Sequence, residues 1–175
     1  AAVDAADALG RVVAGLAGGG EARPGQRRMA EQVADAIGRG RHLFIEKPVT
    51  QTVAEAQLLI AAAKEHGVTA QVGHVERFNP AVDVLGGIPG VRFVEVHRLG
   101  SFSPRSLDID VVLDLMVHDL DIVCRLDGTE VVQVDAVGVP VLTPRVDIAN
   151  ARPRFASGLI ANLTVEQCLT QRKEA

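Results

Sequence analysis

Hydrophobic positions along the chain change from helical spacing to alternating spacing, and the change divides the sequence into two parts. In the first part the spacing predicts two helices, each followed by a short strand: Met29–Arg39, His42–Glu46, a helix that ends at Gly67, and Val68–Gly73. Thr52 and Glu55 have the spacing of a capping box, which places the start of the second helix. This strand–helix–strand succession predicts two parallel strands joined by a right-handed crossover.

The second part contains segments rich in Val and Ile with partial alternation, as in strands. The predicted strands are Val91–Arg98, Glu130–Val141, Asp147–Arg152 and Gly158–Val165. One helix, Val111–Leu126, interrupts them, and its nearly continuous apolar surface predicts that it is buried. Pro153 cannot donate a backbone hydrogen bond to a sheet, so we expect it at an edge or a bulge.

These patterns predict the fold class α/β plus α+β. The C-terminal part of a parallel sheet comes first, and an α+β domain with a largely antiparallel open sheet follows. We expect an irregular or flexible segment at 1–27, a partial α/β domain at 28–80 and a partial α+β domain at 81–175. Gly18-Gly19-Gly20 in the first segment does not have the spacing of a phosphate-binding loop.

Composition narrows the class of function. The 175 residues carry a net charge of −4, and the basic residues form no stripe of the kind that nucleic-acid binding requires. No basic leader precedes an apolar stretch, and no apolar run is long enough to span a membrane, so we expect a cytoplasmic protein without a membrane partner. The two cysteines lack metal-ligand spacing, and Cys124 is expected to be a small core residue.

The tripeptide Glu46-Lys47-Pro48 directly follows the apolar run Leu43-Phe44-Ile45. It therefore lies at the carboxyl end of a predicted strand, the edge at which open α/β sheets bind ligands. A lysine in this place can orient a substrate hydroxyl or transfer its proton. Because exposed lysines at strand ends are common, this interpretation needs support from residues further along the chain.

The predicted helix Val111–Leu126 carries its polar residues on one side. Asp114, His118, Asp121 and Arg125 follow spacings of 4, 3 and 4, which places them within an arc of roughly 60°. In the pair Asp114 and His118, the carboxylate can orient the imidazole, which is the usual general acid or base near neutral pH. The alternative is an internal polar network that ties the helix to the sheet, for example through Asp121 and Arg125.

The loop His74–Pro80 supplies further polar candidates. His74 follows a strand and could line the same cleft, while Arg77 and Asn79 could contact an anionic or sugar ligand. A structural turn explains each of these residues equally well. His97 and Arg98 are expected to be solvated residues at the end of a strand.

Three motifs in this order resemble the glucose-fructose oxidoreductase and inositol dehydrogenase family. They are Glu46-Lys47-Pro48, the run from Val72 to Pro80, and the run from Asp114 to Asp121. The stretches Arg98–Ser106 and Arg145–Asn150 resemble members that act on nucleotide-linked amino sugars, such as UDP-N-acetylglucosamine 3-dehydrogenases.

The resemblance implies a Rossmann-like dinucleotide-binding domain, NAD or NADP as cofactor, and a sugar, cyclitol or nucleotide-sugar substrate. It implies that Lys47, Asp114 and His118 are catalytic, and that these three residues and Asn79 bind substrate. The cofactor contacts it implies are Glu46, Lys47, Pro48, His74 and Arg77. It also implies a homo-oligomer formed through the C-terminal sheet, and no metal. All of this requires Lys47 and His118 to converge on one crevice.

The chain departs from the family pattern because the turn G-x-G-x-x-G is absent, so we expect a fragment of a longer enzyme. Two alternatives remain. One is a metal-dependent hydrolase that uses the acidic residues around His118: Asp108, Asp110, Asp114, Asp119 and Asp121. The other is a non-catalytic interaction module or inactive fragment, whose open sheet edge would pair with another chain.

Overall fold

The computed structural model describes residues 24–50, 52–101 and 109–169. The chain divides into two compact units, Ala1–Gly73 and His74–Ala175. The expectations for residues 1–23 and for most of the stretch Arg98–Ser106 lie outside the described residues, as does Asp108. The domain limits proposed from the sequence stay a prediction.

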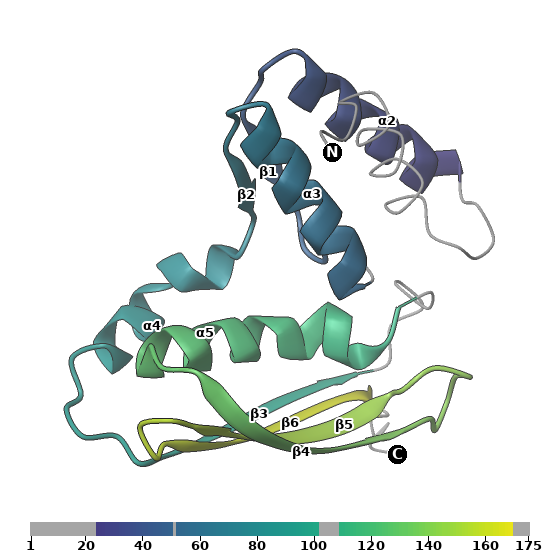
Figure 1. Cartoon of the computed structure of the whole chain (residues 1–175). Helices are drawn as coiled ribbons and strands as arrows, with labels where there is room; N and C mark the ends of the chain where they lie inside the picture. The colour runs from purple at the N-terminus through teal and green to yellow at the C-terminus, as the bar shows by residue number, and fades with distance from the viewer. Residues whose placement is uncertain (1–23, 51, 102–108, 170–175) are drawn as a thin grey trace. The chain divides into compact units, whose positions relative to one another are not determined.

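The described residues of the first unit form a parallel strand pair and two helices (Figure 1). Its described elements are α2 (Pro24–Gly38), β1 (Leu43–Ile45), α3 (Val53–Glu65) and β2 (Ala70–Val72). β1 pairs with β2 in parallel, and Leu43 lies opposite Ala70, as the strand–helix–strand pattern predicts. Helix α2 begins at Pro24, five residues before the predicted start, because proline is well tolerated at the first helical position.

Helix α3 begins where the capping box predicts. The Thr52 hydroxyl accepts the Glu55 backbone N–H at 3.3 Å, and the Glu55 carboxylate accepts the Thr52 backbone N–H at 3.0 Å. Two N–H groups that the helix cannot bond internally are thus satisfied. Leu59 and Ala62 of α3 then pack against Ile45 and Ile37, which are also buried.

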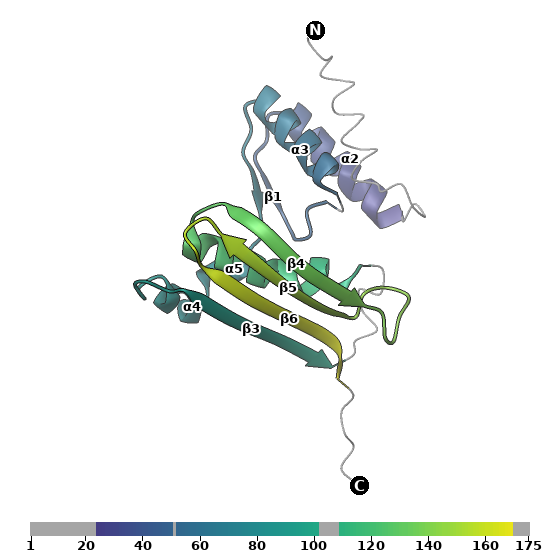
Figure 2. The same ribbon diagram turned by 60° about the horizontal axis from the view of Figure 1, so that its bottom comes forward.

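The second unit contains a four-stranded sheet and several helical segments. The helical segments are the 3-10 helix η1 (Val75–Phe78), α4 (Pro80–Leu85), the π-helical segment η2 (Val112–Met116) and α5 (Val117–Asp127). The strands are β3 (Phe93–Ser101), β4 (Val131–Val139), β5 (Ile148–Phe155) and β6 (Ile160–Leu169). They are arranged in the order β3-β6-β5-β4, with β3 parallel to β6 and the other neighbours antiparallel (Figure 2).

Helices η2 and α5 cover one face of this sheet (Figure 1). Alternate residues of β5 and β6, including Phe155, Leu163 and Val165, are buried and pack with Met116 and Val123 of the helical segments. The opposite face, called the open face below, is polar at its centre, where Asn150 donates to Thr164 at 2.9 Å and to Asn162 at 3.1 Å. This alternation is what an antiparallel sheet with one covered face requires.

Two expectations about this unit are wrong. Pro153 lies in β5, which has neighbours on both sides, rather than at an edge; β5 accommodates it because Arg152 and Pro153 have no registered partner in β6. The helix is half-buried, not buried all round, since only Val111, Met116, Asp119 and Val123 are buried. Cys124 is accordingly exposed, not a core residue.

The loop between β4 and β5 is organised around the carboxylate of Asp147. One oxygen accepts the backbone N–H groups of Val141, Leu142 and Thr143 at 2.7, 2.7 and 2.9 Å, and the other accepts the Thr143 hydroxyl at 2.8 Å. Burial by itself would raise the pKa of Asp147, but these hydrogen bonds lower it from 3.8 to about 2.

We expect Asp147→Asn to destabilise the protein at pH 7 by about 1–3 kcal/mol, because the amide cannot replace a charged acceptor of four donors. Since folding lowers the pKa of Asp147, its contribution is complete above the ordinary pKa of 3.8 and disappears as the pH falls towards about 2. Urea denaturation of both proteins from pH 7 to pH 2 measures this. The difference should shrink towards pH 2, and Asp83→Asn, at an exposed position on α4, is the control.

Candidate active site

Residues that follow the two strands of the first unit lie side by side. Glu46 and Lys47 follow β1, and Gly73 follows β2 and donates its backbone N–H to the Ile45 carbonyl at 2.8 Å. A Cβ added to Gly73 would lie 3.1 Å from a carboxylate oxygen of Glu46. The Lys47–Pro48 peptide bond is cis. The carboxyl ends of parallel strands thus bring Glu46 against the backbone of Gly73, where a side chain would require the Glu46 carboxylate to shift by a few tenths of an ångström.

The polar helix of the second unit starts with a cap and an irregular turn. The Asp110 carboxylate accepts the backbone N–H of Leu113 at 2.9 Å, so Asp110 caps the helix. The segment η2 is then π-helical, and the Val117 N–H bonds to the Val112 carbonyl five residues earlier. Asp114 lies within this wider turn, so its direction differs from the one that a regular spacing of about 100° predicts. Asp114 and His118 are both half-buried.

The next acidic residue, Asp119, points away from the predicted stripe and is held by Arg98 of β3. The Arg98 guanidinium donates to the two Asp119 oxygens at 2.6, 3.0 and 3.2 Å, and the Asp119 side chain is 2% exposed. The hydrogen bonds to Asp119 raise the pKa of Arg98, although burial opposes the shift. Arg98 therefore faces the helix from within β3, so the expectation of a solvated residue at a strand end is wrong for Arg98, whereas the side chain of His97 is exposed.

Asp121 forms the second ion pair of α5, with Arg77 of η1. The Arg77 guanidinium donates to both Asp121 oxygens, at 2.5 and 2.6 Å, and Arg125 donates to the Arg77 carbonyl at 3.2 Å. His74 Nδ1 lies 3.9 Å from the same carboxylate. Burial would raise the pKa of Asp121, but Arg77 and these neighbours lower it. A polar network around Asp121 is present, but it joins α5 to η1 through Arg77 and not to the sheet through Arg125, as the sequence suggested.

Asn79 occupies the start of α4. Its side-chain oxygen accepts the Ala81 backbone N–H at 3.0 Å, and its amide donates to Glu76 at 3.1 Å. Both ends of the amide thus stabilise the turn, as helix caps do. The substrate-binding role of Asn79 and the cofactor-binding role of Arg77 stay predictions.

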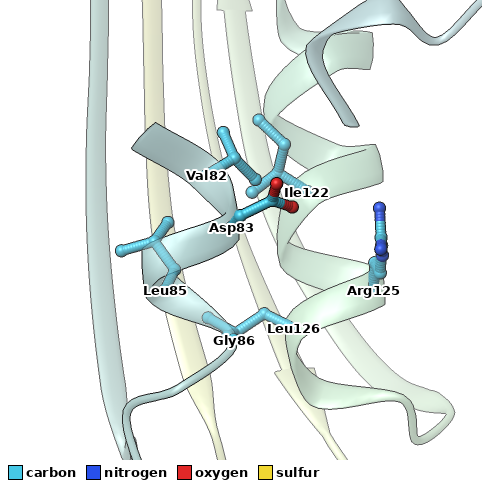
Figure 3. A pocket seen from close by; sticks show the side chains of 7 residues that line it. All are labelled: Val82, Asp83, Leu85, Gly86, Ile122, Arg125 and Leu126. Atoms are coloured by element: carbon cyan, nitrogen blue, oxygen red, sulfur yellow. The ribbon is translucent and has the colours of Figure 1, made fainter. Parts of the chain in front are cut away.

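Each unit has a cavity near these elements. A hollow of about 210 Å³ between α4 and α5 is lined by Val82, Asp83, Leu85, Gly86, Ile122, Arg125 and Leu126. Figure 3 shows Asp83 of α4 pointing toward Ile122 of α5 across it. An apolar groove of about 280 Å³ lies beside α3 and the β1–β2 pair. Neither is lined by Lys47, Asp114 or His118.

The interactions of two buried carboxylates, Asp119 and Asp147, were not predicted from the sequence. The role of Arg98 was missed, although its place on the same face of β3 as Val94 and Val96 is a usable signal for a helix-facing side chain. The binding of the 141–143 backbone by Asp147 was missed as well, because residue spacing gives no signal for it.

A metal centre finds no support in the described part of the chain, where no three His, Cys, Asp or Glu side chains are grouped to hold an ion. Asp119, one of the acidic residues that suggested a hydrolase, is bound by Arg98. Within the same residues, no helix combines the length and apolar character needed to cross a membrane.

Comparisons with known proteins identify relatives for most of the chain. Residues 23–74 match the model of an oxidoreductase family with an NAD-binding Rossmann fold. UDP-N-acetylglucosamine 3-dehydrogenase from Acidithiobacillus ferrooxidans is 42% identical over 138 residues, which cover 78% of this chain and 44% of that protein. An inositol 2-dehydrogenase from Acidothermus cellulolyticus is 31% identical over 60% of this chain and 33% of its own length.

The structural comparison agrees. The crystal structure of the Acidithiobacillus ferrooxidans enzyme superposes with a TM-score of 0.72 at 41% identity, over 79% of this chain and 45% of that chain. The fold class predicted from the sequence is confirmed. The present chain spans less than half the length of these relatives.

Proposed function

Because the chain belongs to the oxidoreductase family with an NAD-binding Rossmann fold, we propose that it takes part in NAD(P)-dependent oxidation or reduction of a hydroxyl on a sugar, cyclitol or nucleotide sugar. The observation that carries the proposal is the position of Lys47, two residues after the end of β1, in the segment that matches the NAD-binding family. The 42% identity to a UDP-N-acetylglucosamine 3-dehydrogenase favours a nucleotide-linked amino sugar as substrate.

The proposed roles follow from side-chain chemistry. His118 removes the proton from the reacting hydroxyl, and Asp114, four residues earlier, holds the substrate and orients the imidazole. Lys47 donates a hydrogen bond to the same hydroxyl and stabilises the negative charge that develops on its oxygen. A bound NAD or NADP would accept the hydride from the carbon that carries this hydroxyl.

The residues after β1 and β2 fit a dinucleotide at this edge. Gly73 lacks a side chain where a Cβ would meet Glu46, so the Glu46 carboxylate lies against the backbone at the end of β2 and is held at this edge. Glu46, Lys47 and Pro48 follow β1 at the same edge, where α/β sheets bind nucleotides. Glu46 and Lys47 carry polar groups that suit the ribose hydroxyls of the cofactor.

We expect Gly73→Ala to weaken NADH binding roughly tenfold, because the new methyl group displaces the Glu46 carboxylate. Titration of NADH fluorescence measures this, and the chain's lack of Trp and Tyr keeps protein emission low. Gly86→Ala is the matched control, since its Cβ would make only an ordinary contact at 3.5 Å. Equal affinity in the two variants would contradict the cofactor role of this edge.

We expect Lys47→Ala and His118→Ala each to reduce turnover by about 10²–10⁴-fold while circular dichroism stays unchanged, because each removes a positioned polar group. The assay measures NADH formation with UDP-N-acetylglucosamine, myo-inositol and glucose as substrates. Lys64→Ala, at an exposed position on α3, is the control.

If Lys47 and His118 act on the same hydroxyl, the double variant should lose little more than the more damaging single variant. Turnover that survives both substitutions would remove the catalytic assignment. Absence of NADH binding in the unaltered protein would instead favour the inactive interaction module.

We also propose that two copies of this chain associate through the open face of the β3-β6-β5-β4 sheet. Its centre consists of short polar side chains, Asn150, Asn162 and Thr164, which allow close approach of a second sheet.

We expect Thr164→Arg to shift the protein toward a monomer in sedimentation velocity, because a long cation would then lie within the interface. Lys64→Ala should sediment like the unaltered protein. If Thr164→Arg also sediments like the unaltered protein, the result contradicts this interface.

A further inference from the structure

Asp119 is one of two buried charged side chains in the described residues. It is 2% exposed, and three contacts within 3.2 Å connect it to the guanidinium of Arg98. A carboxylate removed from water is costly unless charged donors satisfy it. Helix α5 can therefore keep Asp119 buried only while this side chain faces Arg98 on β3.

The other described contacts between the middle of α5 and the strands are apolar, and a further hydrogen bond, from the Ser157 hydroxyl in the β5–β6 turn to Asp127, lies at the C-terminal end of the helix. Val123 of the helix packs in the same cluster as Ala161, Leu163 and Val165 of β6. Apolar packing of this kind is non-directional, so it holds the helix on the sheet without selecting one rotation about the helix axis. The fork of hydrogen bonds from Arg98 is directional.

The neighbouring residue in the helix is His118, which lies about 100° around the axis from Asp119. With Asp119 held against β3, the direction of His118 is fixed as well. The π-helical turn that ends at Met116 makes this anchor more important, because it interrupts the regular backbone immediately before His118.

We propose that Arg98 and Asp119 are positioning residues: their ion pair sets the rotation of α5 and thereby the direction in which His118 faces its substrate. This inference rests on the proposed function in one respect only, the catalytic use of His118. The orientation of the imidazole can be measured without any turnover.

The experiment compares Asp119→Asn and Arg98→Met with the double variant Arg98→Met/Asp119→Leu. Each single variant leaves one charged partner without the other and should lower the urea midpoint. The double variant replaces the pair by apolar side chains, and such replacements are often neutral for stability. It should therefore recover the midpoint while kcat stays lowered by about 10²-fold at nearly unchanged KM, since misplacing a reacting group has an effect of this size.

A second readout is the imidazole Cε1–H resonance of His118, assigned by comparison with His118→Gln. In the folded double variant we expect this resonance to move or to split, because the helix is no longer held in one rotation. A folded double variant with the parent resonance and the parent kcat would overturn the proposal. If the unaltered protein shows no turnover, the proposed function fails, and the resonance alone decides the positioning role.

The matched control removes an exposed ion pair between residues four positions apart, which does not connect a helix to a sheet. Arg39, just after α2, and Asp35 of α2 form a salt bridge at 2.8 Å, and their side chains are 63% and 56% exposed. The double variant Arg39→Met/Asp35→Leu should leave the urea midpoint, the His118 resonance and kcat unchanged, since exposed pairs contribute little. A shift of the resonance in this control would show that the readout is not specific to α5, and would overturn the inference drawn from it.

Discussion

A carboxylate that leaves water must be supplied with donors, and the second unit satisfies this requirement twice. Asp119 receives its donors from a guanidinium on β3, and Asp147 receives three backbone N–H groups and a hydroxyl from its own loop. Both anchors are directional, whereas the alanine, valine and leucine contacts between helix and sheet are not. The arrangement of η2, α5 and the β4–β5 loop on the sheet therefore depends on two acidic side chains.

The same helix uses its acidic residues for different purposes. Asp110 caps it, Asp119 is held by β3, and Asp121 receives Arg77. Arg77 starts the second unit together with His74, so Asp121 fixes the chain just after the boundary between the two units. Asp114 and His118 remain as the pair whose chemistry suits a reaction. A cluster that suggests a metal site in sequence is, in space, divided among separate structural contacts.

Much of the fold was predictable because its signals are local. The capping box at Thr52, the apolar strand before Lys47 and the alternation in β5 and β6 each depend on neighbouring residues, and three short motifs identified the family. The partner of Asp121 was not predictable, since helical spacing favours Arg125 while Arg77 lies 44 positions away in the chain. Pro153 was misplaced because the gap in pairing that accommodates it depends on the register with β6.

The distribution of charge also bears on the choice between an oxidoreductase and a metal-dependent hydrolase. A metal centre needs several anionic or imidazole ligands that point to one spot and are not already neutralised by cations. In α5 the two best-buried carboxylates are each bound by an arginine, which leaves them unsuited to a second cation. A proton-transfer pair requires less: one imidazole whose direction is fixed and one carboxylate to orient it. We propose that Asp114 of η2 and His118 of α5 meet that smaller requirement, while Asp119 and Asp121 hold the helix in place through their arginine partners.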